Sequence, residues 1–463
     1  MTPRNHRRPA RPARAVTAAL AAGALLALSA CSGGSTSAGA GGLGGAAGGG
    51  GDGEGTTLVI PTSQAPWNPA YAEVIDLYER ETGNTVELRE FPNDEVKTQE
   101  INDVNSGANA FDVYQVNESD LAQFLANDWL RPFTDVDPDY ALDPEVYTYD
   151  DLTSWDADTQ LFSADGQLTS APINGNLWVY YYRADLFEQL GLQPPTTWDD
   201  VVANGQALQA SGDVRYGGAY RLQAVPGAAA VTSDFQAIMA GEGARFFTEE
   251  GTDWTPLLDS PQALESARIL RQLAQQGPEA TTTMGQGQAI AAMQAGDAGQ
   301  SYLVAAAAGQ LENEANSNIV GEVGYAPLPA GPDGARTATG IWSLAIPAGL
   351  PDDRAEAALE FIDFVTSQEA QTVFAKAGGV PVRSDYGTDD LPPATSALLE
   401  AVAESADDAT GQVRYTWATD LLDLTEPALG RIAAGEVSPE DGMAQLQADV
   451  TALVQRLGLP VAG

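Results

Sequence analysis

The sequence predicts an α/β protein built from two lobes. At 463 residues the chain is longer than one hydrophobic core normally organises. From Thr57 onward, short apolar runs with strand character alternate with segments of helical periodicity, the pattern expected for a sheet with helical crossovers. Hydrophobic residues make up 44% of the chain, which is typical of a soluble globular protein rather than a membrane bundle.

The residue inventory excludes much chemistry. Asp and Glu total 64 against 22 Lys and Arg, a formal charge of −42 that disfavours nucleic acid as a partner. His6 and Cys31 are the sole residues of their types. A chain that begins at Cys31 therefore lacks a Ser-His-Asp triad, a Cys-His nucleophile and a disulfide. No dinucleotide fingerprint or P-loop is present, so we expect a binding protein without a cofactor or metal.

Residues 1–30 have the layout of a secretory signal, with a basic start and an apolar run too short to span a bilayer. The run Leu28-Ser29-Ala30-Cys31 resembles a bacterial lipobox, which implies lipidation of Cys31 after general secretion. A plain signal peptide with an incidental cysteine is the alternative. Residues 31–56 are rich in Gly, Ser and Ala and predict a flexible tether that spans about 25–30 Å.

The first elements predict a strand–helix–strand unit. A strand at Thr57–Pro61 precedes a helix that Asn68 caps and Gly83 ends, and a second strand follows at residues 86–91. The loop after the first strand is the ligand edge of such a sheet. Ser63, Gln64 and Trp67 in this loop are therefore candidate ligand-binding residues. In an exposed turn Trp67 could stack on a sugar ring, or it could cover its own helix.

The second buried strand is predicted at Phe111–Val116 and a helix follows it. Asn117 and Glu118 stand at the end of this strand, where ligand contacts are expected. Asn117 and Asp120 also form an N-cap pair; capping is favoured for Asp120, and Asn117 stays open between the two roles. The acidic run at residues 135–145 predicts a solvated loop and no calcium site, because Tyr140 occupies the position where an EF-hand needs Gly.

The segment at residues 171–208 carries the clearest pattern. A strand at residues 177–182 leads into a helix that Gly191 ends, and Thr197 with Asp200 forms a capping box for the next helix. Its Tyr-Tyr-Arg strand end, Asp-Leu-Phe helix and Thr-Thr-Trp-Asp turn resemble family 1 extracellular solute-binding proteins, the sugar-capturing subunits of ABC importers. The strand at Asp112 and the segment from Gly340 to Arg383 resemble the same family.

The resemblance implies a two-lobe periplasmic-binding-protein type II fold with discontinuous lobes. Lobe 1 would comprise residues 57–172 and 329–378, and lobe 2 residues 173–328 and 379–463, with crossings near Pro172, Pro329 and Gly379 acting as a hinge beside a ligand cleft. The implied function is capture of a sugar, an oligosaccharide or glycoside, by cleft closure and delivery to a membrane permease. The protein would be a monomer, anchored by lipid at the outer face of the cytoplasmic membrane.

The resemblance also implies binding roles for particular residues. Trp342 is the strongest aromatic candidate, and Trp342→Ala is expected to cost about 1–3 kcal/mol of binding with little loss of fold. Tyr302 stands where the family usually has Trp, and Arg383 either points into the cleft or is merely exposed. The remaining candidates are Asn174, Asn176, Trp178, Tyr180, Gly340 and Trp417.

Two alternatives remain open. A secreted glycosidase needs only a suitably spaced carboxylate pair, which this acidic chain could supply, although no motif nominates one. The same fold could also bind a polyamine, a phosphoester or a metal chelate. An anionic solute is least favoured, because few cations lie near the predicted cleft segments: Arg183, Arg221 and Arg383.

Overall fold

The computed structural model describes residues 55–461 except 93–94, 227–228, 333, 335 and 407–408. These residues belong to one compact unit that runs from Gly53 to Gly463. The predicted signal segment, Cys31 and the predicted tether as far as residue 54 lie outside the described residues. Among the helices that are described, none has the length and apolar character needed to cross a membrane.

The chain starts with the predicted strand–helix–strand unit. β1 (Thr57–Ser63) and β2 (Thr85–Phe91) pair in parallel over their whole length, and α1 (Asn68–Thr82) connects them. Gly83 ends α1 with a left-handed φ of 76°, which Gly adopts without a steric penalty. The face that α1 buries contains the predicted residues Tyr71, Val74, Ile75 and Tyr78.

The start of α1 differs from the prediction. Trp67 occupies the N-cap position, and no side chain caps the helix there. Asn68 is the first helical residue, and its Nδ2 donates to the Ser63 carbonyl oxygen at 2.8 Å. The prediction that Asn68 caps the helix is therefore wrong, because its amide group binds the end of β1 instead.

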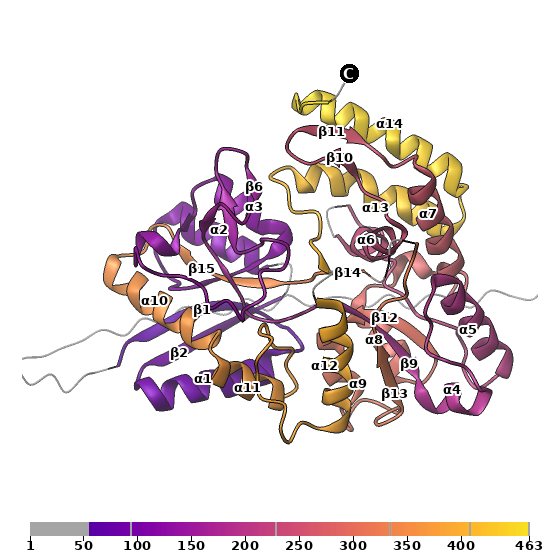
Figure 1. Cartoon of the computed structure of the whole chain (residues 1–463), viewed down its shortest axis with the longest axis horizontal. Coiled ribbons are helices and arrows are strands. Elements are labelled where there is room, and N and C mark those ends of the chain that lie inside the picture. Colours follow the sequence, from indigo (N-terminus) through magenta and orange to yellow (C-terminus); the bar gives the residue numbers. More distant parts are fainter. Residues whose placement is uncertain are drawn as a thin grey trace, which may run out of the picture. The chain divides into compact units, whose positions relative to one another are not determined.

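A strand from late in the chain completes the first half of the molecule. β15 (Trp342–Pro347) pairs antiparallel with β3 (Tyr114–Asn117), β4 (Leu130–Arg131) and β8 (Ala171–Pro172). Two late helices, α10 (Asp352–Val365) and α11 (Gln368–Lys376), pack against α1. Figure 1 shows these orange helices beside the indigo start of the chain.

Asp112 joins three elements of this half. One carboxylate oxygen accepts the Val59 N–H of β1 at 2.7 Å, and the other accepts Arg354 Nε of α10 at 2.6 Å. The Asp112 side chain is 1% exposed, so this pairing is buried. The strand after it begins at Tyr114 rather than at Phe111 as predicted.

The two residues considered for the α3 cap have separate roles. α3 (Glu118–Ala126) is capped by Asn117, whose Oδ1 accepts the Ser119 N–H at 3.1 Å. Asp120 instead forms an ion pair with Lys97 of α2 (Val96–Ser106). The capping role favoured for Asp120 is therefore wrong, because a cation from a neighbouring helix binds its carboxylate.

The second half is organised around β9 (Trp178–Arg183). β12 (Gln300–Val304) and β13 (Val323–Ala326) pair antiparallel with its two edges. α4 (Ala184–Leu190) follows β9 and ends at Gly191, and the predicted capping box of Thr197 and Asp200 starts α5 (Trp198–Ser211). These local predictions are confirmed.

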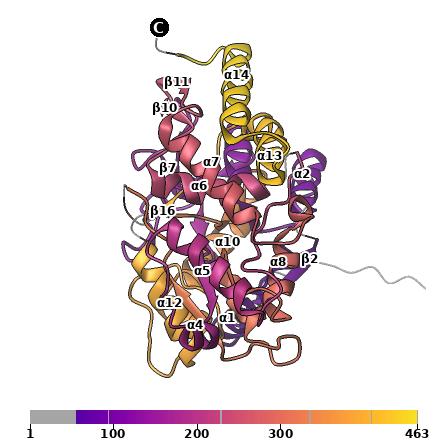
Figure 2. The same ribbon diagram turned by 90° about the vertical axis from the view of Figure 1, so that its right-hand side faces the viewer.

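A layer of helices covers the second half, as Figures 1 and 2 show. α6 (Ala230–Glu242), α7 (Pro261–Ala274), α13 (Ala418–Ala434) and α14 (Pro439–Leu457) pack against one another. Ser438 caps α14, since its hydroxyl oxygen accepts the Asp441 N–H. The hairpin of β10 (Phe247–Glu249) and β11 (Asp253–Pro256) packs against α14.

Shorter elements connect these layers. The described helical segments not yet named are η1 (Phe133–Asp135), η2 (Thr281–Thr283), α8 (Gln286–Gln294), η3 (Ala305–Ala307), α9 (Ala308–Leu311) and α12 (Pro393–Ala406). The described short strands are β5 (Ser154–Asp156), β6 (Leu161–Phe162), β7 (Gln167–Leu168), β14 (Thr337–Ala338) and β16 (Ala409–Thr410). After β8 the chain leaves the sheet that contains β15 and enters the sheet that contains β9. After β13 it returns to the sheet of β15. Later in the chain, α12 packs against β13 of the second sheet.

Candidate functional site

Two predicted tryptophans meet where the β1–α1 turn approaches β15. The ring centroids of Trp67 and Trp342 are 6.0 Å apart with the planes tilted by 51°. Trp67 is 5% exposed and Trp342 is 7% exposed, so the prediction of an exposed Trp67 is wrong. Asn174 Oδ1 accepts the Trp342 N–H at 3.3 Å. We call Ser63, Trp67, Asn174 and Trp342 the tryptophan patch.

The tryptophan patch contains unsatisfied polar atoms. Ser63 Oγ, Trp67 Nε1 and Asn174 Nδ2 are buried and have no hydrogen-bond partner among the described residues. Buried polar groups are nearly always paired, because an unpaired group costs about 1–3 kcal/mol. The patch therefore offers donors and an acceptor to a water molecule or a solute beside two apolar ring faces.

A close backbone approach connects this patch to the second half. The Gly340 N–H donates to the Asn176 carbonyl oxygen at 2.8 Å, and Asn176 Nδ2 donates back to the Gly340 carbonyl oxygen at 3.2 Å. A Cβ at Gly340 would lie 3.0 Å from the Trp178 ring and 3.2 Å from the Asn176 oxygen. A larger residue at position 340 would therefore fit tightly and would push its neighbours apart by a few tenths of an ångström, and the predicted residues Asn176, Trp178 and Gly340 lie in close contact.

Trp178 belongs to a buried polar cluster. Its Nε1 donates to Asp234 Oδ1 at 3.0 Å, and Arg221 Nε donates to the same oxygen at 3.1 Å. The Arg221 guanidinium also lies 5.0 Å from the Trp178 ring centroid. Burial raises the pKa of Asp234 to about 6, although Arg221 opposes the shift. Arg221 is therefore paired with Asp234.

Glu118 is a second buried carboxylate. Thr339 Oγ1 donates to it at 2.7 Å and the Ile341 N–H donates at 3.2 Å. Burial raises the pKa of Glu118 to about 7, against the opposing effect of these two hydrogen bonds. Glu118 thus joins the start of α3 to the segment that leads into β15, which is a positioning role rather than a contact with open space.

Four other predicted residues lie on elements that border the patch and the Trp178 cluster. Gln64 is exposed, and Asn117, which caps α3, is the β3 residue opposite Trp342 in the sheet. Tyr180 and Tyr302 face each other across β9 and β12 and are fully buried; the Tyr180 hydroxyl donates to Gln300, and Tyr302 packs on Tyr220 at 5.3 Å.

Arg383 and Trp417 also have structural partners. Arg383 is 4% exposed and forms ion pairs with Asp143 (3.1 Å) and Asp385 (2.8 Å), so the alternatives of an exposed or a cleft-facing Arg383 are both wrong. Trp417 stacks on Tyr415 at 4.9 Å. These contacts stabilise the fold.

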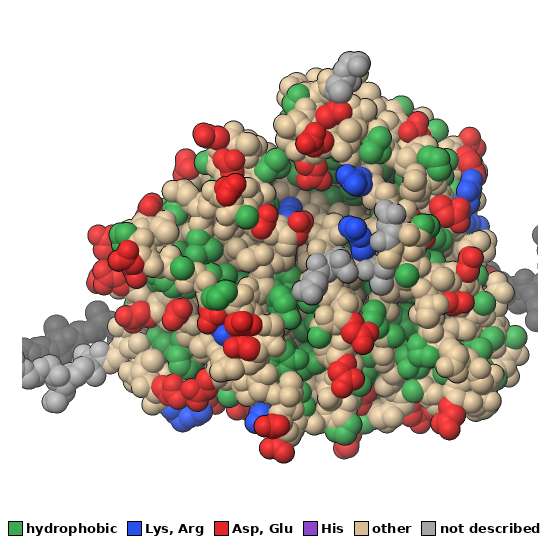
Figure 3. All heavy atoms as spheres, in the orientation of Figure 1, with side chains coloured by type: hydrophobic (Ala, Val, Ile, Leu, Met, Phe, Trp, Pro, Cys, Tyr) green, Lys and Arg blue, Asp and Glu red, His purple; other side chains and the backbone are tan. Residues whose placement is uncertain are grey.

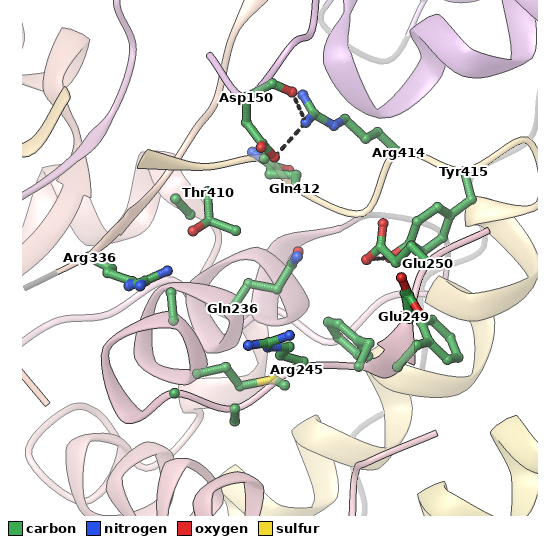
Figure 4. A pocket seen from close by; sticks show the side chains of 18 of the residues that line it. Asp150, Gln236, Arg245, Glu249, Glu250, Arg336, Thr410, Gln412, Arg414 and Tyr415 are labelled. Atoms are coloured by element: carbon green, nitrogen blue, oxygen red, sulfur yellow. Dashed lines mark hydrogen bonds and ion pairs between the residues drawn. The ribbon is translucent and has the colours of Figure 1, made fainter. Parts of the chain in front are cut away.

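An open pocket of about 410 Å³ lies next to this region, within the size range of small-molecule sites. Figure 4 shows its polar side chains. We call it the arginine pocket, after Arg245, Arg336 and Arg414. Its other lining residues are Asp150, Gln236, Met239, Ala240, Gly243, Ala244, Phe246, Phe247, Thr248, Glu249, Glu250, Ala338, Thr410, Gly411, Gln412 and Tyr415. Among these described lining residues, none was nominated by the sequence.

Hydrogen bonds run from the arginine pocket toward the tryptophan patch. Gln412, in the pocket wall, donates to the Thr339 carbonyl oxygen, Thr339 Oγ1 donates to Glu118, and Glu118 also accepts the N–H of Ile341, the residue before Trp342. Within the pocket, Arg414 pairs with Asp150 at 2.6 Å and the Tyr415 hydroxyl donates to Glu250. The pocket thus combines amides, hydroxyls, carboxylates and guanidinium groups with the rings of Phe247 and Tyr415.

Most of the chain matches a known protein family. Residues 61–372, more than half of the chain, match the family described as bacterial extracellular solute-binding protein. The chain belongs to this family. The resemblance to family 1 solute-binding proteins is therefore confirmed. The members of this family are binding proteins, which agrees with the predicted role.

Solved structures share the fold of this solute-binding protein. An ABC transporter solute-binding protein of Agrobacterium radiobacter K84 in complex with ribitol is 21% identical, with 86% of this chain and 99% of that chain covered and a TM-score of 0.70. Maltose-bound MalE3 of T. maritima is 21% identical, with 86% and 100% covered and a TM-score of 0.69. UgpB of Mycobacterium tuberculosis in complex with glycerophosphocholine is 20% identical, with 88% and 100% covered and a TM-score of 0.68. The predicted two-lobe α/β fold is confirmed.

Proposed function

We propose that this chain is the solute-capturing subunit of an ABC importer, that it acts outside the cell, and that its solute is a sugar or polyol. The observation that carries the proposal is the arginine pocket: about 410 Å³ of open space with amide, hydroxyl and aromatic side chains, in a member of the extracellular solute-binding family. Hydroxylated solutes need many hydrogen bonds and offer apolar C–H faces to aromatic rings. Structural neighbours that hold ribitol and maltose support this class.

The tryptophan patch is the proposed second contact region for the same solute. Its unpaired Ser63 Oγ, Trp67 Nε1 and Asn174 Nδ2 are the kinds of groups that bind sugar hydroxyls. Because the patch is buried, a solute reaches it only if the two halves move apart. Closure around the solute would then bury both regions together and present a closed shape to the permease.

The proposed anchor is the lipidated Cys31, with residues 31–56 as a tether between membrane and binding unit. Mass spectrometry of the protein isolated from membranes tests it. A diacylglyceryl modification on Cys31 is expected, and Cys31→Ala should release the protein into the medium. An unmodified N-terminus at another residue would contradict the anchor.

Calorimetry with purified protein tests the solute class. Titration with maltose, ribitol and a panel of neutral oligosaccharides should give one-to-one binding, and chromatography of the mixtures should recover each solute unchanged. Gln236→Ala, which removes a pocket amide, should lower affinity about tenfold, the cost of one or two hydrogen bonds. The matched control is Gln445→Ala on the exposed face of α14.

Two results would contradict this proposal in different ways. Failure of every hydroxylated solute to bind at millimolar concentration would exclude the solute class. Formation of new reducing ends would show that the chain is a glycosidase.

A further inference from the structure

The arginine pocket gathers cations in a chain that has few of them. The whole sequence holds 64 acidic residues against 22 basic ones, and acidic side chains clearly outnumber basic ones on the face drawn in Figure 3. Nevertheless three separate segments each bring one arginine to the same pocket: Arg245 between α6 and β10, Arg336 before β14 and Arg414 after β16. None of these three arginines was predicted from the sequence to lie near the ligand.

Two of these arginines are unpaired. Arg414 is satisfied, since it binds the Asp150 carboxylate and the Tyr149 carbonyl oxygen. Arg245 and Arg336 have no hydrogen-bond or ion-pair partner in the part of the chain that the structure describes. Most other described arginines do pair with a carboxylate; Arg89, Arg131 and Arg268 are examples even on the exposed surface.

The pocket acids do not neutralise these two cations. Asp150 is bound to Arg414, and the Tyr415 hydroxyl donates to Glu250, whose pKa is raised by desolvation. In Figure 4, Glu249 and Glu250 lie toward one side of the pocket, Arg336 lies toward the other, and Arg245 lies between them. The described lining thus holds three carboxylates and three guanidinium groups, but no ion pair joins Glu249 or Glu250 to Arg245 or Arg336 among the described residues.

We propose that Arg245 and Arg336 bind an anionic group, a carboxylate or phosphate, on the hydroxylated solute. The proposal rests on the function proposed above and narrows its solute class. A guanidinium presents a planar set of donors that matches the oxygens of either group, and two arginines from separate segments can clamp one anion. Gln412 is already bound to Thr339 and Ser233, and Gln236 Oε1 accepts the Val413 N–H, so Gln236 Nε2 is the pocket amide group that could donate to a hydroxyl of the solute.

The first test uses inorganic anions, so it does not depend on knowing the solute. The melting temperature of the full protein is measured in phosphate, acetate and chloride at matched ionic strength. Phosphate or acetate should raise it by several degrees relative to chloride, and R245Q/R336Q should abolish the rise. The control R268Q removes an exposed arginine bound to Glu265 and Glu440, outside the pocket, and should keep the rise. An equal melting temperature in all three salts overturns the proposal.

The second test compares solutes that differ by one charged group. Glucuronate and glucose 1-phosphate are each compared with glucose by calorimetry. We expect at least tenfold tighter binding of one anion, and the stronger of the two identifies carboxylate or phosphate as the natural group. R245Q/R336Q should bind all three equally. Neutral glucose binding as tightly as both anions would overturn this inference and leave the proposed function intact, whereas loss of binding to every sugar and polyol tested would remove the proposed function itself.

Discussion

The tryptophan patch and the arginine pocket differ in nearly every physical property. The patch is buried, uncharged and built from residues that the sequence nominated, with three unpaired polar atoms beside two indole rings. The pocket is open, charged and built from residues that no motif nominated. Yet hydrogen bonds run from Gln412 in the pocket through Thr339 and Glu118 to Ile341, the residue before Trp342.

This contrast separates two kinds of constraint on a binding site. The patch lies where strands end and the backbone passes between the halves, so packing and hydrogen bonds restrict the residue types there. Beside the patch, a Cβ at Gly340 would lie only 3.0 Å from the Trp178 ring. The pocket side chains come from loops and from α6, β10, β14 and β16, which are far apart in the sequence. If the pocket selects the solute and the patch contacts it on closure, as proposed, substitutions in the two regions should have different effects.

The largest expected effect is a loss of stability when Trp342 of the tryptophan patch is replaced. Trp342 is 7% exposed and packs in the core of the first half, so Trp342→Ala should lower the free energy of unfolding by about 3–5 kcal/mol. The sequence alone led us to expect little loss of fold, whereas the burial of Trp342 among core residues favours this larger loss. Urea unfolding measures the effect, with the half-buried Trp417→Ala as a comparison that should lose less. A loss below about 1 kcal/mol would show that the patch is open in solution.

The second-largest expected effect is a pH dependence of stability that comes from Glu118, which lies between the two regions. Burial raises the pKa of Glu118 to about 7, so the folded protein takes up a proton that the unfolded chain releases near pH 4.5. The stability contributed by this protonation is complete below about pH 4.5 and is lost as pH rises through 7. Relative to Glu118→Gln, the wild type should therefore lose about 2–3 kcal/mol between pH 5 and pH 8.

Urea unfolding of both proteins at the two pH values measures this difference. Glu404→Gln, an exposed position on α12, is the control and should follow the wild type. Parallel pH profiles for the wild type and Glu118→Gln would mean that Glu118 is solvated, and that the link between pocket and patch opens readily.

Local signals in the sequence predicted local structure well. The Thr197–Asp200 capping box and the glycines that end α1 and α4 are determined by neighbours within a few positions, so the sequence alone reveals them. The caps predicted at Asn68 and Asp120 are wrong because distant groups compete for those side chains: the Ser63 carbonyl oxygen and Lys97. Tertiary partners override a capping preference of about 1 kcal/mol.

The arginine pocket could not be predicted in this way. Its Asp150–Arg414 ion pair joins positions 264 residues apart, and no repeat or motif marks either one. Arg183, Arg221 and Arg383 were the cations expected near the ligand, but each is paired with a carboxylate in the structure. Only the folded arrangement distinguishes them from Arg245 and Arg336, for which the described residues supply no ion-pair partner.

The third prediction separates binding from stability within the patch. Ser63 Oγ is buried without a partner, so Ser63→Ala should leave the free energy of unfolding unchanged or raise it by up to about 1 kcal/mol. If the hydroxyl binds the solute, affinity falls about tenfold, or about 1.4 kcal/mol. The matched control is the fully buried Ser266, which donates to the Gln262 carbonyl oxygen; Ser266→Ala should lose about 1 kcal/mol of stability and no affinity. Calorimetry and urea unfolding of the two variants measure both quantities, and unchanged affinity in Ser63→Ala would remove the patch from the binding site.

The smallest effect distinguishes the regions by their response to salt. Screening shortens the range of charge interactions from about 10 Å at 0.1 M salt to about 3 Å at 1 M, and it acts most on open, charged sites. Affinity for a neutral sugar, which both regions bind through hydrogen bonds and ring contacts, should change less than twofold between 0.05 and 0.5 M sodium chloride, as calorimetry at the two salt concentrations would measure. An anionic sugar should weaken several-fold over the same range, and R245Q/R336Q should respond as weakly as the neutral solute does. A neutral sugar with a steep salt dependence would place charge at the patch, which the described side chains of Ser63, Trp67, Asn174 and Trp342 do not carry.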